Sequence, residues 1–311
     1  MRKTVLALLI AAYAASCAGN PEKEGFMPAF REDFSKAVPQ YFQMRRSPLL
    51  YYSGVHSLTE ENTDVLLMQI DPSGGPYPDN GAEIYTPSFT HFGTYSARLR
   101  MPRLNEVQPD AGVVTGFFTY HFTPGAGLSE IDFEWLLADP QLIYIGTWTS
   151  APDDLNKLQR IGRTVNLATG EILYTNYYSY HDYVGGEGIV NEAPKNCFDE
   201  SDDAALTPRT IKAIPGYDAS SRFYVYGFDW YPDRLTWWVE HPETGEKTVL
   251  WDYRGTTPHF SGIPQSPTVF MLNFWHTDNW PVETNPNSTE APKYPYILEA
   301  DWIRYEPYDN L

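Results

Sequence analysis

Glu130-Ile131-Asp132-Phe133-Glu134, EIDFE in one-letter code, is the stretch around which the rest of this chain is interpreted. Successive side chains of a β-strand point to opposite faces, so its three carboxylates share one face and its two apolar side chains share the other. A row of like charges is unfavourable unless cations or a function balance it, and the flanking residues supply no cation. The alternation therefore predicts a strand that covers a core and carries an acidic row on its other face.

Apolar and aromatic residues border this acidic row. A strand-like segment at 113–120 and a turn at 124–127 precede it, and Trp135 follows it directly. A solvated acidic strand edge would account for the carboxylates alone. Carboxylates placed centrally in a sheet and bordered by aromatic rings are instead what cleavage of a glycosidic bond requires. One carboxylic acid protonates the leaving oxygen, and a second carboxylate attacks or stabilises the oxocarbenium-like centre.

Composition and strand spacing predict an all-β fold for the 311 residues. The 42% hydrophobic fraction excludes disorder, and the 23 Tyr and 9 Trp favour strands over helices. Short apolar segments recur between turn clusters without a sustained helical period, which is typical of a sandwich or jelly roll. The expected strands are 65–70, 95–99, 113–120, 130–136, 141–148, 223–230, 235–239, 269–274 and 297–305.

Two stretches, 151–169 and about 184–219, interrupt this rhythm and are rich in Asp, Asn, Gly and Pro. We expect long loops there, which either border a cleft or are exposed decoration. The formal net charge of -18 argues against nucleic acid and strongly anionic polysaccharides as partners, so a neutral polymer fits better. Cys17 and Cys197 are the only cysteines, and they supply neither a disulfide framework nor a Cys-rich metal site.

The first 18 residues are expected to be an export signal. Two cations precede the apolar segment 5–12, which is too short to span a membrane as a mature helix. Processing could follow the bacterial lipoprotein pattern, with Cys17 acylated as the only membrane anchor, or be ordinary cleavage after Ala18. The protein would then be exported, either to the outer surface or periplasm as a lipoprotein or as a freely secreted protein. Residues 19–30 are expected to be a tether.

EIDFE matches the ExDxE pattern of glycoside hydrolase family 16, and the chain resembles this family over roughly residues 30–307. The motif has no extra bulge residue, and in this it resembles the branch of bacterial licheninases and plant xyloglucan endotransglycosylases. The resemblance implies a curved β-jelly-roll sandwich with a substrate cleft on its concave face, formed by a single catalytic domain at 31–311. Further blocks that match in the family's order are 92–99, 112–120, 226–237, 271–275 and 300–305.

The resemblance also implies a retaining double displacement. By motif position Glu130 would be the nucleophile, Glu134 the general acid/base, and Asp132 the residue that holds the nucleophile and tunes its pKa. The Cα atoms of the two glutamates lie about 13 Å apart on a flat strand, whereas retention needs carboxyl groups about 5 to 5.5 Å apart. Long side chains that lean inward on a concave strand can close that gap.

Aromatic platforms are expected to bind the glycan, because sugar rings expose apolar CH faces that stack on flat side chains. For each aromatic candidate the alternative is core packing. Asp301 matches a residue that binds a structural calcium in many family members; no cofactor is expected to be required. The substrate-binding candidates are Glu83, Phe118, Tyr120, Trp135, Trp148, Asn273, Trp275 and Trp280.

Departures from the licheninase pattern leave the glycan open. Leu128 and Ser129 stand where licheninases carry Trp-Asp, Tyr85 replaces an Arg, and Gly146 lies near an expected Asn. The sequence predicts an exported, monomeric, endo-acting retaining glycoside hydrolase of a neutral β-glycan, with a β-1,3-1,4- or related β-glucan fitting best. The alternatives are an endotransglycosylase with the same residues and a non-catalytic surface carbohydrate-binding protein on the same fold.

Overall fold

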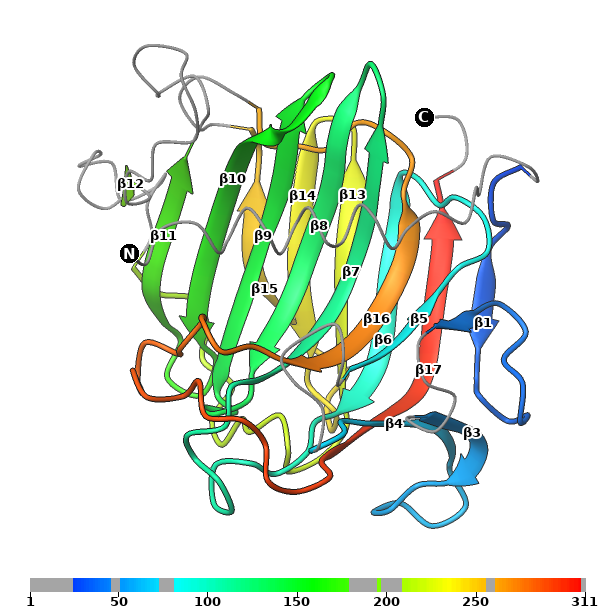
Figure 1. The fold of residues 1–311 in the computed structure, drawn as a ribbon, viewed down its shortest axis with the longest axis vertical. Helices are drawn as coiled ribbons and strands as arrows, with labels where there is room; N and C mark the ends of the chain where they lie inside the picture. Colours follow the sequence, from blue (N-terminus) through cyan, green and yellow to red (C-terminus); the bar gives the residue numbers. More distant parts are fainter. Residues whose placement is uncertain are drawn as a thin grey trace.

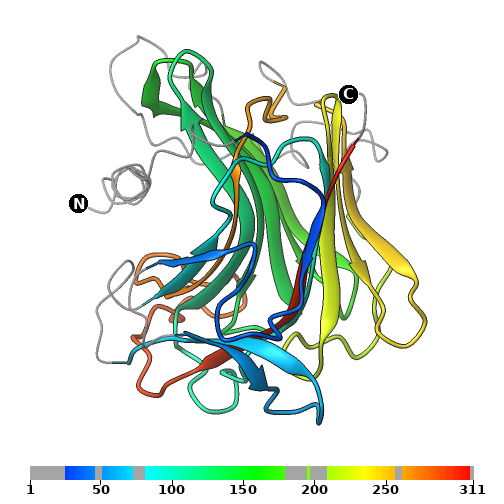
Figure 2. The same cartoon turned by 90° about the vertical axis from the view of Figure 1, so that its right-hand side faces the viewer.

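The described chain is an all-β sandwich of two antiparallel sheets (Figures 1 and 2). Within the described ranges no helix has the length and hydropathy of a membrane span. The expected leader 1–18 with Cys17, most of the expected tether, and Cys197 lie outside the described residues. A computed structural model describes residues 25–45, 51–72, 81–178, 195–196, 209–255 and 261–308.

The smaller sheet has eight strands in the described part of the chain, in the order β15-β14-β13-β6-β17-β4-β3, with β1 paired to β17. It forms the far layer in Figure 1, where β13 and β14 lie behind the front sheet. Its strands are β1 (Phe30–Glu32), β3 (Tyr51–His56), β4 (Asp64–Gln69), β6 (Gly93–Arg100), β13 (Tyr224–Tyr231), β14 (Arg234–Glu240), β15 (Lys247–Tyr253) and β17 (Ile297–Pro307).

The larger sheet has nine strands among the described residues, in the order β12-β11-β10-β9-β8-β7-β16-β5-β2. Figure 2 shows this sheet in profile, where it curves with its concave side turned away from the smaller sheet. We call this side the concave face. Its strands are β2 (Gln43–Arg45), β5 (Ala82–Tyr85), β7 (Val113–Thr123), β8 (Gly127–Leu136), β9 (Leu142–Ala151), β10 (Asp154–Asn166), β11 (Glu171–Tyr178), β12 (Lys195–Asn196) and β16 (Val269–His276).

All nine strands expected from the sequence are confirmed, but the expectation of a loop over 151–169 is wrong. The strand β10 occupies residues 154–166 and pairs with β9 and β11. Its polarity hid it, because Arg163 stands at a core-facing position. The buried guanidinium donates hydrogen bonds from Nε to Thr175 Oγ1 at 2.9 Å and from Nη1 to the Leu250 carbonyl at 3.2 Å, which offsets part of the cost of burying its charge.

The main core lies between the sheets and includes the apolar side of β8. Ile131, Phe133 and Trp135 are fully buried, and the Phe133 and Trp135 rings stack with centroids 4.9 Å apart. Each such side chain stabilises the fold by about 1.5–3 kcal/mol through burial. Trp237 on β14 crosses the core and donates its indole N–H to the Asp132 carbonyl at 3.0 Å. The core therefore holds the middle of β8 by packing and by a hydrogen bond from the opposite sheet.

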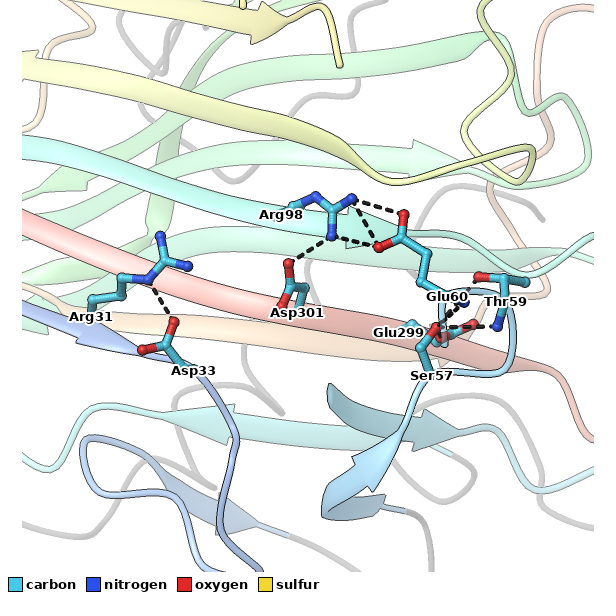
Figure 3. Close-up of polar contacts among 8 residues, drawn as sticks. All are labelled: Arg31, Asp33, Ser57, Thr59, Glu60, Arg98, Glu299 and Asp301. Carbon is cyan, nitrogen blue, oxygen red and sulfur yellow. Dashed lines mark hydrogen bonds and ion pairs between the residues drawn. The ribbon is translucent and has the colours of Figure 1, made fainter. Parts of the chain in front are cut away.

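Hydrogen bonds from Ser57 to Glu299 and from Arg98 to Glu60 attach the turn after β3 to the smaller sheet (Figure 3). Glu299 is fully buried and accepts hydrogen bonds from Arg100 Nε at 2.9 Å and from Ser57 Oγ at 2.5 Å. Beside this pair, Arg98 donates to both carboxylate oxygens of Glu60. Only 11% of the Arg100 side chain is exposed, so loss of Glu299 would leave a nearly buried positive charge without its carboxylate.

Candidate active site

The EIDFE segment lies on β8, near the middle of the larger sheet (Figure 1). Pairing with β7 runs without a register shift from Tyr120 opposite Glu130 to Gly116 opposite Glu134. Pairing with β9 is equally regular through this segment. The strand is therefore unbulged, and the predicted alternation is confirmed: the three carboxylates share the concave face, while Ile131 and Phe133 enter the core.

The carboxylates are buried against one another. Asp132 is 3% exposed, Glu130 and Glu134 are half-buried, and the side chains of Glu130 and Asp132 are hydrogen-bonded. Burial raises the pKa of Glu130, and the Glu134 charge raises it further, while the hydrogen bond from Asp132 opposes the rise. Burial, followed by the charges of Glu130 and Glu134, raises the pKa of Asp132. Burial raises the pKa of Glu134 to about 8, against the opposing charge of Arg160.

These shifts distribute protons unequally among the three groups. Adjacent buried carboxyl groups cannot all ionise at neutral pH, because each charge raises the cost of the next. A protonated Asp132 donates to a Glu130 carboxylate and favours its ionised form, whereas Glu134 retains a proton near neutrality. The row thus places a carboxyl group whose ionised form the Asp132 hydrogen bond favours, against the rise caused by burial, beside one that holds its proton near neutral pH.

Arg160 on β10 supplies the cation that the local sequence lacks. Cross-strand pairing places Glu130, Trp148 and Arg160 in one row on the concave face. The guanidinium carbon lies 5.2 Å from the centroid of the Trp148 ring, and its charge lowers the pKa values of Asp132 and Glu134. Alternation along a strand at 154–166 would place Arg160 on the same side of the sheet as the three carboxylates. Only the order of the strands brings Arg160 close to them.

Phe118 and Tyr120 stand on the concave face opposite Asp132 and Glu130. They are 4% and 2% exposed, so they form an apolar floor beside the carboxylates rather than free platforms. This floor lies on the concave face and is separate from the main core. Apolar residues at alternating positions indicate burial, but they do not show whether the buried side chains belong to the main core or to the concave face. Its buried members are Phe118, Tyr120, Leu128, Leu158, Val269 and Met271.

Asn273 and Glu83 also lie on this face. Asn273 pairs with Gly116, which in turn is opposite Glu134, and its Oδ1 accepts a hydrogen bond from the Gly116 N–H at 2.9 Å. Glu83 is the next residue along the same row and is fully buried, with an oxygen 3.2 Å from a nitrogen of Arg45. Arg45 was not foreseen from the sequence, and 19% of its side chain is exposed on this face.

Three tryptophans are half-buried near the acidic row. Trp148 is opposite Glu130, Trp275 follows the row of Asn273 along β16, and Trp280 lies edge-on against Tyr144 with ring centroids 5.5 Å apart. These placements suit the expected sugar-stacking role, because each ring keeps exposed surface.

The expectation that Trp135 binds substrate is wrong. Its side chain projects from the opposite face of β8, is fully buried in the main core, and donates its indole N–H to the Tyr217 hydroxyl at 3.3 Å. Residue 135 continues the alternation of Ile131 and Phe133, so the sequence parity already placed it with them.

The surroundings of Asp301 do not fit a calcium site. Asp301 Oδ2 accepts a hydrogen bond from Arg98 at 2.7 Å, as Figure 3 shows, so a cation of the protein already neutralises it. Among the described residues no group of three or more His, Cys, Asp or Glu side chains could hold a metal. Calcium prefers six to eight oxygen ligands, and the side chains here do not supply such a set.

No family model matches the chain, but individual proteins are similar to it. A beta-glucanase from Acetivibrio thermocellus is 26% identical over 244 residues, covering 77% of this chain and 52% of that protein. A beta-glucanase from Brevibacillus brevis is 24% identical over 231 residues, covering 73% of this chain and 61% of that protein. The chain thus spans little more than half the length of these curated relatives.

A solved structure of Bacillus licheniformis beta-glucanase superposes with a TM-score of 0.53 at 18% identity, covering 91% of this chain and all of that one. A glycoside hydrolase family 16 endo-glucanase from Bacteroides ovatus superposes with a TM-score of 0.55 at 10% identity, covering 89% of this chain and 99% of that one. At these identities the likeness concerns the fold, and it extends over nearly the whole of both chains.

Proposed function

We propose that this chain belongs to glycoside hydrolase family 16 and is an endo-acting hydrolase that cleaves a β-glucan with retention of configuration. The observation that carries the proposal is the row of Glu130, Asp132 and Glu134 on one face of an unbulged, buried strand. Retention requires a nucleophilic carboxylate and a second carboxyl group that acts first as acid and then as base.

In the first step Glu130 attacks the anomeric carbon while Glu134 gives its proton to the glycosidic oxygen, which leaves with the departing chain. The hydrogen bond from Asp132 favours the ionised form of Glu130 that attacks, and burial raises the pKa of Glu134 so that it holds a proton near neutral pH. In the second step the ionised Glu134 takes a proton from water, which displaces Glu130 and releases the glycan. Both glutamates then regain their starting protonation states.

We place the glycan across the concave face, where half-buried tryptophans and Arg45 present surface on both sides of the acidic row. The curated relatives are named beta-glucanases, and the net charge of -18 disfavours anionic polymers. A β-1,3-1,4-linked or related neutral β-glucan is therefore the proposed substrate. An enzyme that cleaves a polysaccharide acts outside the cytoplasm, which agrees with the proposed export signal at 1–18.

The test begins with purified protein on lichenan, laminarin, xyloglucan and galactans, with product sizes recorded over time. We expect short β-gluco-oligosaccharides from an early stage, and NMR should show the β-anomer as the first product. Longer products formed with added oligosaccharide acceptors would indicate an endotransglycosylase instead. Retention of glycan without cleavage would indicate a binding protein.

Two variants separate the catalytic roles. Glu130→Ala should lower glycan hydrolysis by at least about 10³-fold, and azide, a small anion that can take the place of the carboxylate, should restore turnover with an α-glycosyl azide as product. Glu134→Ala should retain the first step, seen as release of 2,4-dinitrophenolate, on a 2,4-dinitrophenyl glycoside, whose leaving group needs no proton. Unchanged hydrolysis by Glu130→Ala would show that the nucleophile is assigned incorrectly.

A further inference from the structure

Tyr144 brings a buried hydroxyl next to the acidic row from the side of β9. It stands opposite Glu134 in the β8-β9 pair and is 2% exposed. Its hydroxyl oxygen has no hydrogen-bond partner among the described residues. Burying a hydroxyl without a partner costs free energy, so a polar group in this position points to a partner outside the protein.

Two glycines make room for this side chain. Gly146 lies between Asp132 on β8 and Gly162 on β10 in one cross-strand row. A Cβ atom at Gly146 would lie 2.7 Å from the Tyr144 hydroxyl oxygen, and one at Gly162 would lie 2.6 Å from it. The ring therefore leans from the row of Glu134 into the row of Asp132, and its hydroxyl lies over the two glycines.

The position of the hydroxyl is fixed by packing. The Tyr144 ring meets the edge of Trp280 at an interplanar angle of 89° and belongs to a buried cluster with Val282. The hydroxyl also interacts electrostatically with Arg160, Asp132 and Glu134. A donor held in place before a ligand arrives loses little entropy when it forms a hydrogen bond.

On the other side of Glu134, Gly116 stands on β7 without a side chain, and the Oδ1 of Asn273 on β16 accepts the Gly116 N–H. A sugar unit whose glycosidic oxygen touches Glu134 therefore meets a fixed hydroxyl donor on the side of β9.

We propose that Tyr144 is a specificity residue whose hydroxyl donates a hydrogen bond to a hydroxyl of the leaving sugar unit, the unit whose glycosidic oxygen Glu134 protonates. This inference rests on the proposed function. It assigns recognition of the leaving unit to a tyrosine whose hydroxyl lies over two glycines, of which Gly146 lies near an Asn of the licheninase pattern.

The experiment compares Tyr144→Phe with wild type on two substrates that share one β-gluco-oligosaccharide glycone. One substrate has a sugar leaving unit and the other a 2,4-dinitrophenyl leaving group, which carries no sugar hydroxyl. We expect kcat/KM to fall about 3- to 10-fold on the first and less than about 2-fold on the second. An equal fall on both substrates, or no fall on either, overturns the proposal.

Thermal unfolding of the ligand-free protein separates this role from a structural one. Tyr226→Phe is the matched control, because its buried hydroxyl is hydrogen-bonded to that of Tyr217 at 3.0 Å in the main core. The control should lower Tm and leave the ratio of the two kcat/KM values unchanged. Tyr144→Phe should leave Tm equal or higher, since it removes a hydroxyl without a protein partner.

The outcomes separate the two proposals. A drop in Tm for Tyr144→Phe as large as that of the control would show that the hydroxyl is structural. Wild-type protein that cleaves neither substrate would overturn the proposed function and this inference with it. Wild-type protein that cleaves both, together with an unaffected Tyr144→Phe variant, would overturn this inference alone.

Discussion

Replacing Arg160 by Gln should move the basic limb of the kcat/KM profile to higher pH. This limb reports loss of the proton from the general acid of the free enzyme. Burial raises the pKa of Glu134 to about 8, and the Arg160 charge acts in the opposite direction. Removing the cation leaves burial opposed by less positive charge, so Glu134 should hold its proton to a higher pH. The Glu134 charge in turn raises the pKa values of Glu130, Asp132 and Tyr144.

The raised pKa of Glu134 gives the size of the effect of burial on its protonated fraction. With a pKa of about 8, roughly 90% of Glu134 is protonated at pH 7. At its ordinary value of 4.5, only about 0.3% would carry a proton at that pH. Burial therefore increases the available acid about 300-fold at neutral pH. Wild-type kcat/KM should stay high at pH 7 and halve near pH 8.

Initial rates at low concentrations of a soluble β-glucan, measured from pH 4 to 10, test this reasoning. Arg160→Lys is the control, because it keeps the positive charge while removing the planar group over Trp148. Its basic limb should stay close to that of wild type. A wild-type basic limb below pH 6 would refute the effect of burial on Glu134, and a limb that moves to lower pH in Arg160→Gln would refute the assigned role of the cation.

Two further substitutions test how the sandwich supports the site. Glu299→Gln should lower the free energy of unfolding by about 3–5 kcal/mol, because Arg100 is left nearly buried without its carboxylate; a urea midpoint equal to that of wild type would contradict this. Trp237→Phe removes the indole N–H that donates to the Asp132 carbonyl and should cost about 1–3 kcal/mol in urea unfolding. It should also reduce kcat/KM, and unchanged stability and rate would show that this hydrogen bond does not support β8.

Much of the fold was predictable because strand segments are local patterns. Alternation placed Ile131 and Phe133 in the core and the three carboxylates on the other face, and the structure agrees. The same parity argument, applied to the next residue of the series, would have excluded Trp135 from the substrate-facing set. Strand β10 escaped detection because Arg163 interrupts its apolar positions, and its partners come from other strands.

The sequence by itself determined the acidic row, its facing direction and the all-β class, since all three depend on residue spacing along one strand. Only the tertiary structure decided which residues flank that row. Arg160, Tyr144 and Gly162 come from β9 and β10, and no periodicity within β8 specifies their register against it. The proton distribution likewise depends on burial and on charges brought together by strand pairing. The three carboxylates lie on one strand and can be recognised from the local sequence. The residues that shift their pKa values come from neighbouring strands and are brought there by the pairing of the sheet.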